Sequence, residues 1–146
     1  MNLTFRPWTI KDTFFIAKLC FALFIDAWDY GMVMKSFRSE RFIGVLVEDD
    51  GIIVGFACGT TLFEEGEVDL IAVKEEYRKK GLGKQLLSCL EQEAKNRGAE
   101  RTSLEVRVSN VPALLLYLNG GYRSVKVRKK YYADGEDAVI MEKKLN

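Results

Sequence analysis

The sequence predicts an α/β fold of the α+β kind, in which helices cover both faces of a mixed sheet. Three observations support this: strand-length apolar segments alternate with segments of helical periodicity, Gly, Asp and Asn mark the turns, and 146 residues suffice for one core. The expected order of elements is β-α-α-β-β-β-α-β-α-β-β, in one domain that spans residues 1–146.

The first half of the chain is expected to form a strand, two helices and a three-stranded meander. Thr9, with an acidic residue three positions later, is typical of a helix N-terminus, and a phenylalanine-rich run to Phe24 follows it. Asp49-Asp50-Gly51 is typical of a hairpin turn between two apolar strands. The expected strands are 2–6, 42–48, 52–63 and 67–73, with a second short helix at 32–37.

The second half begins with the clearest helix. Leu82, Leu86, Leu90 and Ala94 recur at every fourth position, so they line one face, and Gly98 is suited to end the helix. Asn119-Gly120-Gly121 is expected to stop a shorter helix. The expected helices are 82–97 and 112–118, and the expected strands are 102–108, 122–128 and 137–144.

Composition excludes several classes of function. The net charge of +1 provides no basic field for nucleic acid, and no apolar run reaches the roughly 18 residues that span a bilayer. Because there is no histidine, Ser-His-Asp catalysis and the common His-ligated metal sites are excluded, and no metal is expected. Cys20, Cys58 and Cys89 lie far apart and no signal-peptide pattern is present, which favours a cytoplasmic protein with reduced thiols.

Charged side chains are nevertheless segregated along the chain. The simplest interpretation of each run is a solvated face. The acidic run contains Glu64, Glu65, Glu67 and Asp69, and the late basic run contains Lys126, Arg128, Lys129 and Lys130.

The segment Arg78-Lys79-Lys80-Gly81-Leu82-Gly83-Lys84 joins an apolar strand to a helix and predicts a phosphate-binding turn. Glycines at 81 and 83 let the backbone bend sharply and approach a ligand closely. The free N–H groups and the dipole of the helix N-terminus favour an anion at the same place. The alternative is an ordinary strand-to-helix turn, with glycines for packing and a solvated basic face.

The spacing of the glycines narrows the choice of phosphate loop. A P-loop needs Ser or Thr after the lysine, and the dinucleotide fingerprint needs a third glycine, and this segment has neither. The remaining pattern, Arg-x-x-Gly-x-Gly after Ile71-Ala72-Val73, resembles the acyl-CoA pyrophosphate loop of the GNAT acetyltransferases.

The resemblance to this family covers nearly the whole chain and is weak only from about residue 14 to 41. It is strongest to the RimI type, bacterial enzymes that acetylate the N-terminal alanine of a ribosomal protein. Residues 24–29 keep the aromatic side chains of that type but lack its proline and hydroxyl residue, which leaves the acceptor open. The matching residues are Arg6-Pro7 with Asp12, then Leu104-Glu105-Val106-Arg107, Asn110, Ala113, Leu116-Tyr117 and Gly121-Tyr122.

The resemblance implies acetyl-CoA as the acyl donor. A backbone N–H at 71–73, where the family has a bulge, is implied to meet the oxyanion of the tetrahedral intermediate. Asn110 is implied to bind the pantetheine region, although it can also be the N-cap of the next helix. The implied cofactor-binding residues are Ile71, Ala72, Val73, Arg78, Lys79, Lys80, Gly81, Leu82, Gly83, Lys84 and Asn110.

Glu105 and Tyr117 are the catalytic residues that the resemblance implies. Acetyl transfer needs a neutral amine and a proton for the departing thiolate. Glu105, the only acid on its strand, is implied to take the amine proton, directly or through water. Without the resemblance, an ordinary solvent-facing position is the favoured interpretation of this residue. Tyr117 is implied to donate a proton to sulfur, and core packing among neighbouring leucines is the alternative.

These inferences predict an acetyl-CoA-dependent N-acetyltransferase that transfers the acetyl group directly in a ternary complex. The expected acceptor is a protein N-terminal α-amine, such as that of a ribosomal protein. The alternatives are a lysine side chain, a polyamine or an aminoglycoside as acceptor and, in another class, a non-catalytic acyl-CoA-binding module. No nucleic acid or membrane partner is expected, and the oligomeric state is expected to be a monomer or homodimer.

Overall fold

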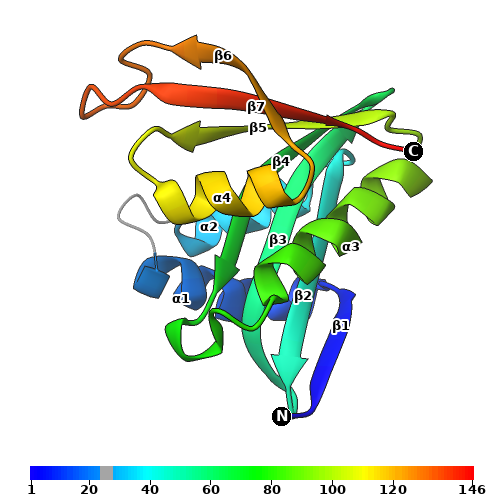
Figure 1. The fold of residues 1–146 in the computed structure, drawn as a ribbon. Helices are drawn as coiled ribbons and strands as arrows, with labels where there is room; N and C mark the ends of the chain where they lie inside the picture. Colours follow the sequence, from blue (N-terminus) through cyan, green and yellow to red (C-terminus); the bar gives the residue numbers. More distant parts are fainter. Residues whose placement is uncertain (24–27) are drawn as a thin grey trace.

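A computed structural model describes residues 1–23 and 28–146, and it contains a seven-stranded sheet with helices on both faces (Figure 1). The strand order is β1-β2-β3-β4-β5-β7-β6. Only the central pair, β4 and β5, is parallel, and the other neighbours are antiparallel. The predicted fold class and the predicted order of elements are confirmed.

The predicted boundaries agree with the observed ones to within two residues, except at the start of the first helix. There a short 3-10 turn, η1, comes first, and the predicted end at Phe24 lies outside the described residues. The strands are β1 Leu3–Pro7, β2 Phe42–Asp49, β3 Ile52–Leu62, β4 Glu65–Val73, β5 Arg101–Arg107, β6 Arg123–Arg128 and β7 Ala138–Lys144. The helices are η1 Ile10–Asp12, α1 Thr13–Leu23, α2 Tyr30–Phe37, η2 Glu75–Tyr77, α3 Leu82–Asn96 and α4 Val111–Asn119.

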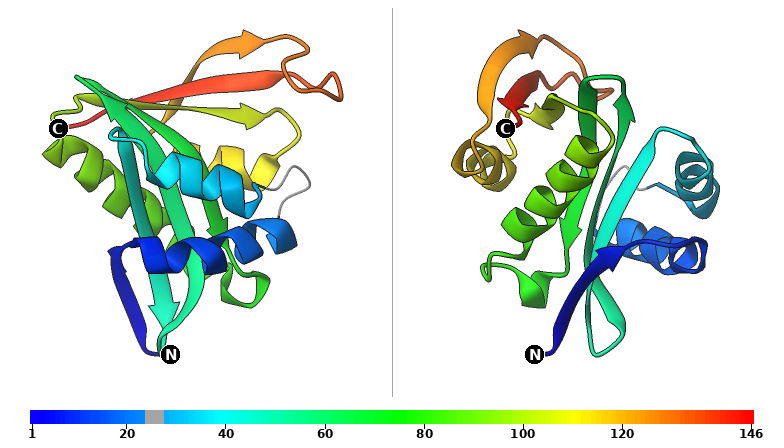
Figure 2. Two further views of the ribbon diagram at one scale, coloured as in Figure 1. Left: turned by 180° about the vertical axis from the view of Figure 1, so that it is seen from behind. Right: turned by 90° about the vertical axis from the view of Figure 1, so that its right-hand side faces the viewer.

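The sheet separates two apolar cores. Figure 2 shows α3 and α4 on one face and α1 and α2 on the other. The core under α3 contains the predicted helix face, with Leu82, Leu86, Leu90 and Ala94 all buried. Helix α1 differs from the prediction of a helix apolar on most of its surface: its buried face is narrow, because only one side meets the sheet. That face contains Ile16, Ala17, Leu19 and Cys20, whereas Phe14, Phe15 and Phe21 are exposed.

The glycines predicted to stop the helices do so. Gly98 has a φ of +98°, a left-handed conformation that favours glycine, and the next N–H, of Ala99, donates to the Ala94 carbonyl at 3.0 Å. Gly121, with a φ of +96°, ends α4 in the same way. Within the described residues, no helix combines the length and apolar character that a membrane span requires.

Strands β4 and β5 pair along only part of their length, and this opens the sheet. Their ladder runs from Glu65↔Arg101 to Val68↔Leu104. At that point β4 has an extra residue, Asp69, because the β3–β4 register shifts by one between Cys58 and Gly59. Beyond the bulge, β4 continues along β3 to Val73 while β5 diverges from it (Figure 1). The result is a gap in the middle of the sheet between the end of β4 and the end of β5. The chain continues from β4 into α3 and from β5 into α4.

Candidate active site

The predicted phosphate turn lies between β4 and α3. Lys79 and Gly81 have φ values of +62° and +80°, so the backbone turns twice through the left-handed region. Gly81 caps α3, and its carbonyl accepts the first helical hydrogen bond from Gln85 at 3.1 Å. The N–H groups of the first turn, including that of Gly83, therefore have no partner within the helix. Lys80 is exposed beside them, so the turn combines free donors with positive charge.

The two glycines of this turn have different explanations. Gly81 needs its positive φ, which any glycine-rich turn would explain. At Gly83 the backbone is helical, and a Cβ would meet the Leu116 side chain at 3.5 Å, an ordinary contact. Packing therefore does not require glycine at position 83, because the neighbouring side chain leaves room for a Cβ.

Arg78 and the end of β4 place main-chain donors at the gap. Arg78 Nε donates to the Val73 carbonyl at 3.0 Å, and the Lys74 N–H donates across to Val54 on β3 at 2.8 Å. Because N–H directions alternate along an antiparallel strand, the N–H groups of Val73 and Ile71 point away from β3, toward the gap. The bulge lies at Asp69, two residues before the segment 71–73 where the resemblance implied it, since it forms where β4 leaves β5.

Of the cofactor-binding residues that the resemblance implied, Ala72 offers no N–H to the gap. Its N–H faces β3, and the residue is buried in the core under α1. Asn110 is the N-cap of α4, as the alternative interpretation held, because its Oδ1 accepts from the Ala113 N–H at 3.2 Å. The Nδ2 amide group is not needed for this cap and can still donate to a ligand.

Glu105 lies on β5, where its two neighbours point to the opposite face. Leu104 and Val106 are buried in the core under α3, so Glu105 faces the α1 and α2 side and is exposed. The hydroxyl of Tyr131, from the β6–β7 loop, donates to Glu105, and this hydrogen bond raises the pKa of Tyr131. The carboxylate therefore lies beside the gap, with a tyrosine across it.

Two further carboxylates, Glu67 and Asp69 on β4, adjoin Glu105. Burial, followed by the charges of Glu67 and Glu105, raises the pKa of Asp69 to about 7. Burial and then the charge of Glu105 raise the pKa of Glu67. Both residues are nevertheless exposed, so their carboxyl groups are accessible to solvent. We call Glu67, Asp69 and Glu105 the carboxylate group.

The carboxylate group was not anticipated from the sequence, where Glu67 and Asp69 were interpreted as part of a solvated face. The available signal was their alternation, since acids at every second position of a strand share one face. The missing information was the pairing with β5, which brings this face next to Glu105.

Tyr117 approaches the gap from the other face of the sheet. It is 9% exposed on α4, and its ring packs edge-on against Tyr122 with centroids 5.8 Å apart. Burial, with a smaller contribution from Tyr132, raises the pKa of Tyr117 to about 12. Its hydroxyl is hydrogen-bonded to none of the residues that the structure describes. The phenol is thus protonated at neutral pH and available to donate.

Tyr132 connects the two faces. Its electrostatic interaction with Tyr117 contributes to the raised pKa of Tyr117, and the charge of Glu105 raises the pKa of Tyr132 itself, after burial. Tyr132 is therefore within electrostatic range of both Glu105 and Tyr117. These two residues face the gap from opposite sides of the sheet.

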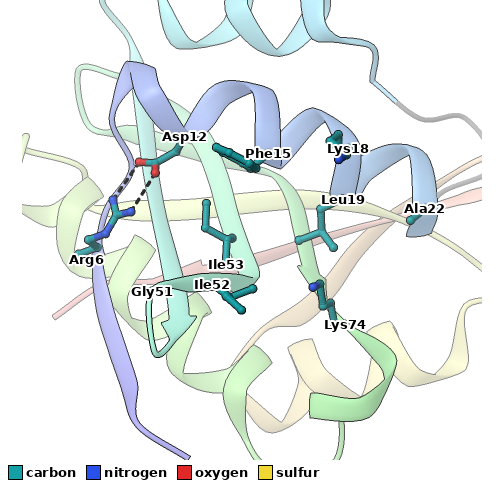
Figure 3. A pocket seen from close by; sticks show the side chains of 10 residues that line it. All are labelled: Arg6, Asp12, Phe15, Lys18, Leu19, Ala22, Gly51, Ile52, Ile53 and Lys74. Atoms are coloured by element: carbon teal, nitrogen blue, oxygen red, sulfur yellow. Dashed lines mark hydrogen bonds and ion pairs between the residues drawn. The ribbon is translucent and has the colours of Figure 1, made fainter.

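Two hollows lie on the α1 face, away from the phosphate turn. One, of about 400 Å³, lies between α1 and the β2–β3 turn and contains the ion pair of Arg6 with Asp12, at 2.8 Å (Figure 3). That pair holds β1 to the start of α1, which explains why the two residues occur together. The second, of about 550 Å³, is lined by Phe14, Ala17, Lys18, Phe21, Trp28, Asp29 and Tyr30. None of the cofactor-binding or catalytic residues implied by the resemblance lines either hollow.

Comparison with known proteins identifies the family of the chain. The model of the acetyltransferase (GNAT) family matches residues 7–122. An N-alpha-acetyltransferase of Sulfurisphaera tokodaii is 40% identical over 121 residues, which are 74% of this chain and 71% of that protein. The [ribosomal protein bS18]-alanine N-acetyltransferase of Escherichia coli is 37% identical over 113 residues, 73% of this chain and 76% of that protein. A Saccharolobus solfataricus N-alpha-acetyltransferase is 50% identical over 86 residues, and the matched segment spans about half of that protein, 52%.

Solved structures show the same fold over the whole chain. The ribosomal-protein-S18-alanine N-acetyltransferase from Escherichia coli superposes with a TM-score of 0.89 at 29% identity, covering 99% of this chain and 94% of that one. Ard1 from Thermoplasma volcanium has a TM-score of 0.90 at 23% identity, with coverage of 100% and 99%. A mixed sheet that opens between β4 and β5, with helices on both faces, is the fold of an N-acetyltransferase of the GNAT type. The chain belongs to the acetyltransferase (GNAT) family, as its sequence predicted.

Proposed function

We propose that this protein transfers an acetyl group from acetyl-CoA to the N-terminal α-amine of a protein, with a ribosomal protein as the first candidate and the cytoplasm as the compartment. The main support is the placement of Glu105 and Tyr117 on opposite faces of one gap, beside the phosphate turn. Relatives named as N-alpha-acetyltransferases and as bS18-alanine N-acetyltransferases support the choice of acceptor.

The residues around the gap suit the binding of acetyl-CoA. In this proposal the N–H groups of the first turn of α3, with Lys80 and Lys84, hold the pyrophosphate. The N–H groups of Ile71 and Val73 and the amide of Asn110 hold the pantetheine chain, whose reactive end supplies an acetyl thioester.

Each proton in the reaction then has a group to move it. Glu105, directly or through water, removes a proton from the ammonium of the acceptor, and because an α-amine has a pKa near 8, a weak base suffices. A C–N bond forms, and a main-chain N–H at the end of β4 stabilises the oxyanion. The C–S bond then breaks, and the Tyr117 hydroxyl gives its proton to the departing sulfur. The second proton that the nitrogen loses as it becomes an amide returns, through water, to the Tyr117 oxygen.

A choice of four acceptors tests the proposal. Release of free CoA is measured with a peptide that has a free N-terminus and no lysine, with an N-blocked peptide that contains lysine, with spermidine and with an aminoglycoside. We expect acetylation of the first alone, located by mass spectrometry. If only the blocked peptide or the small amines react, the acceptor is a lysine side chain, a polyamine or an aminoglycoside, and the proposal is wrong. Binding of acetyl-CoA with no reaction would indicate a non-catalytic module. Mass spectrometry of ribosomal proteins from cells with and without the gene identifies the natural acceptor.

Substitution of Gly83 distinguishes an effect on acetyl-CoA binding from an effect on the stability of the fold. We expect Gly83→Ala to leave the free energy of unfolding unchanged or to raise it by up to about 1 kcal/mol, because alanine is the better helix former. Gly83→Asp should in contrast weaken the affinity for acetyl-CoA by about a hundredfold or more, since it adds a negative charge at an anion site. Titration calorimetry and thermal unfolding measure the two effects, with Ser88→Ala on an exposed position of α3 as the control. Unchanged affinity in Gly83→Asp would refute the phosphate turn.

A further inference from the structure

A row of residues crosses the sheet from the carboxylate group to the edge strand β6. Glu105 lies opposite Ile140 on β7, and Ile140 lies opposite Lys126 on β6. Because residues opposite one another in a sheet point to the same face, Lys126 faces the α1 side together with Glu105. At a strand spacing of about 4.8 Å, two strands place their backbones about 10 Å apart.

Arg128 adds a second positive charge on this face. It follows Lys126 by two residues on the same strand, and its guanidinium lies 5.9 Å from the centre of the Tyr131 ring. Tyr131 in turn donates its hydroxyl to Glu105. Arg128 therefore lies beside the tyrosine that interacts with Glu105.

Neither cation is neutralised by the fold. Lys126 and Arg128 are exposed, and no acidic side chain among the described residues forms an ion pair with either of them. Nearby, Lys129 pairs with Asp137 at 3.4 Å, so the local acid serves a different lysine. The α1 face thus has negative charge at the gap and unpaired positive charge about 10 Å away, at the edge.

We propose that Lys126 and Arg128, the basic edge, select acceptors whose N-terminal residue is followed by acidic side chains. The inference rests on the proposed function, because it needs a peptide whose ammonium lies at the carboxylate group. An extended chain rises about 3.3 Å per residue, so its second to fourth residues reach the basic edge. Acidic side chains there complement the edge, and basic ones are repelled by it.

Three peptides test the inference on the wild-type protein. They share the N-terminal residue and the tail, and they have Asp and Glu, Ala, or Lys and Arg at positions two to four. We expect kcat/KM to be highest for the acidic peptide and lower by about tenfold or more for the basic one, with the difference shrinking as salt is added. Equal kcat/KM for the three peptides would overturn the inference while leaving the proposed function intact.

Charge reversal locates the effect. The double variant Lys126→Glu/Arg128→Glu should reverse the order of the three peptides and leave the neutral peptide within about twofold of wild type. Lys95→Glu, an exposed reversal on α3 on the opposite face, is the control for the single variant Lys126→Glu, which changes the net charge by the same amount, and it should keep the wild-type order. If the control variant has an equal effect, the order of the peptides reflects the net charge of the whole protein rather than the basic edge, and the inference is overturned. If the protein acetylates spermidine but none of the three peptides, the proposed function and this inference are both overturned.

Discussion

Tyr117→Phe should lower turnover by roughly 10² to 10⁴ while the protein stays folded. The substitution keeps the ring that packs on Tyr122 and removes only the hydroxyl. Since that hydroxyl is bonded to none of the described residues, the free energy of unfolding should fall by no more than about 1 kcal/mol. The large loss falls on the chemical step, because the thiolate must then leave without a proton.

A synthetic acyl donor and a neighbouring tyrosine make this test specific. A less basic thiolate can leave a thioester without being protonated. Tyr117→Phe should therefore recover part of its turnover when the acyl donor is a thioester with such a leaving group. Tyr122→Phe is the matched control, because the Tyr122 hydroxyl donates to the buried Glu91 at 2.8 Å and contacts Thr102. It should lower stability by about 1–3 kcal/mol and spare turnover, the reverse pattern. Wild-type turnover in Tyr117→Phe would make Tyr117 a packing residue only.

The parts of the fold predictable from the sequence are those with local signals. Helix α3 shows four apolar residues at every fourth position, and its last turn is followed by a glycine that takes a positive φ. The β2–β3 hairpin is signalled by Asp50-Gly51, both of which adopt positive φ. Such patterns depend on the residue and its near neighbours, so the sequence contains all that they need.

The parts that could not be predicted depend on pairing between distant strands. Asp69 has no local mark of a bulge, because the bulge arises where β4 keeps its ladder with β3 and loses the one with β5. The face on which Glu105 points follows from burial of Leu104 and Val106, which a seven-residue strand alone does not reveal. For the same reason the carboxylate group and the basic edge emerge only when the sheet is assembled.

Glu105→Gln should lower turnover by roughly 10² or more at neutral pH, with little change in the affinity for acetyl-CoA. Glutamine can still accept the Tyr131 hydrogen bond, so the geometry is kept and only the ability to take a proton is lost. Steady-state kinetics across pH, with titration calorimetry for acetyl-CoA, separate the two quantities. Turnover close to wild type at neutral pH would show that another group is the base.

The carboxylate group predicts how the remaining activity of Glu105→Gln depends on pH. The charge of Glu105 is one of the causes that raise the pKa of Asp69 to about 7, so removing this charge lowers that pKa. If Asp69 accepts the proton in the variant, the remaining activity shows an acidic limb that reports the pKa of Asp69, and this limb lies below about 7 because the charge of Glu105 is gone. Adding Asp69→Asn should abolish that limb, whereas Asp69→Asn alone should leave turnover within about tenfold of wild type. If the remaining activity instead rises continuously with pH and reaches no plateau, bulk water or hydroxide takes the proton, and Asp69 only holds the ammonium in place.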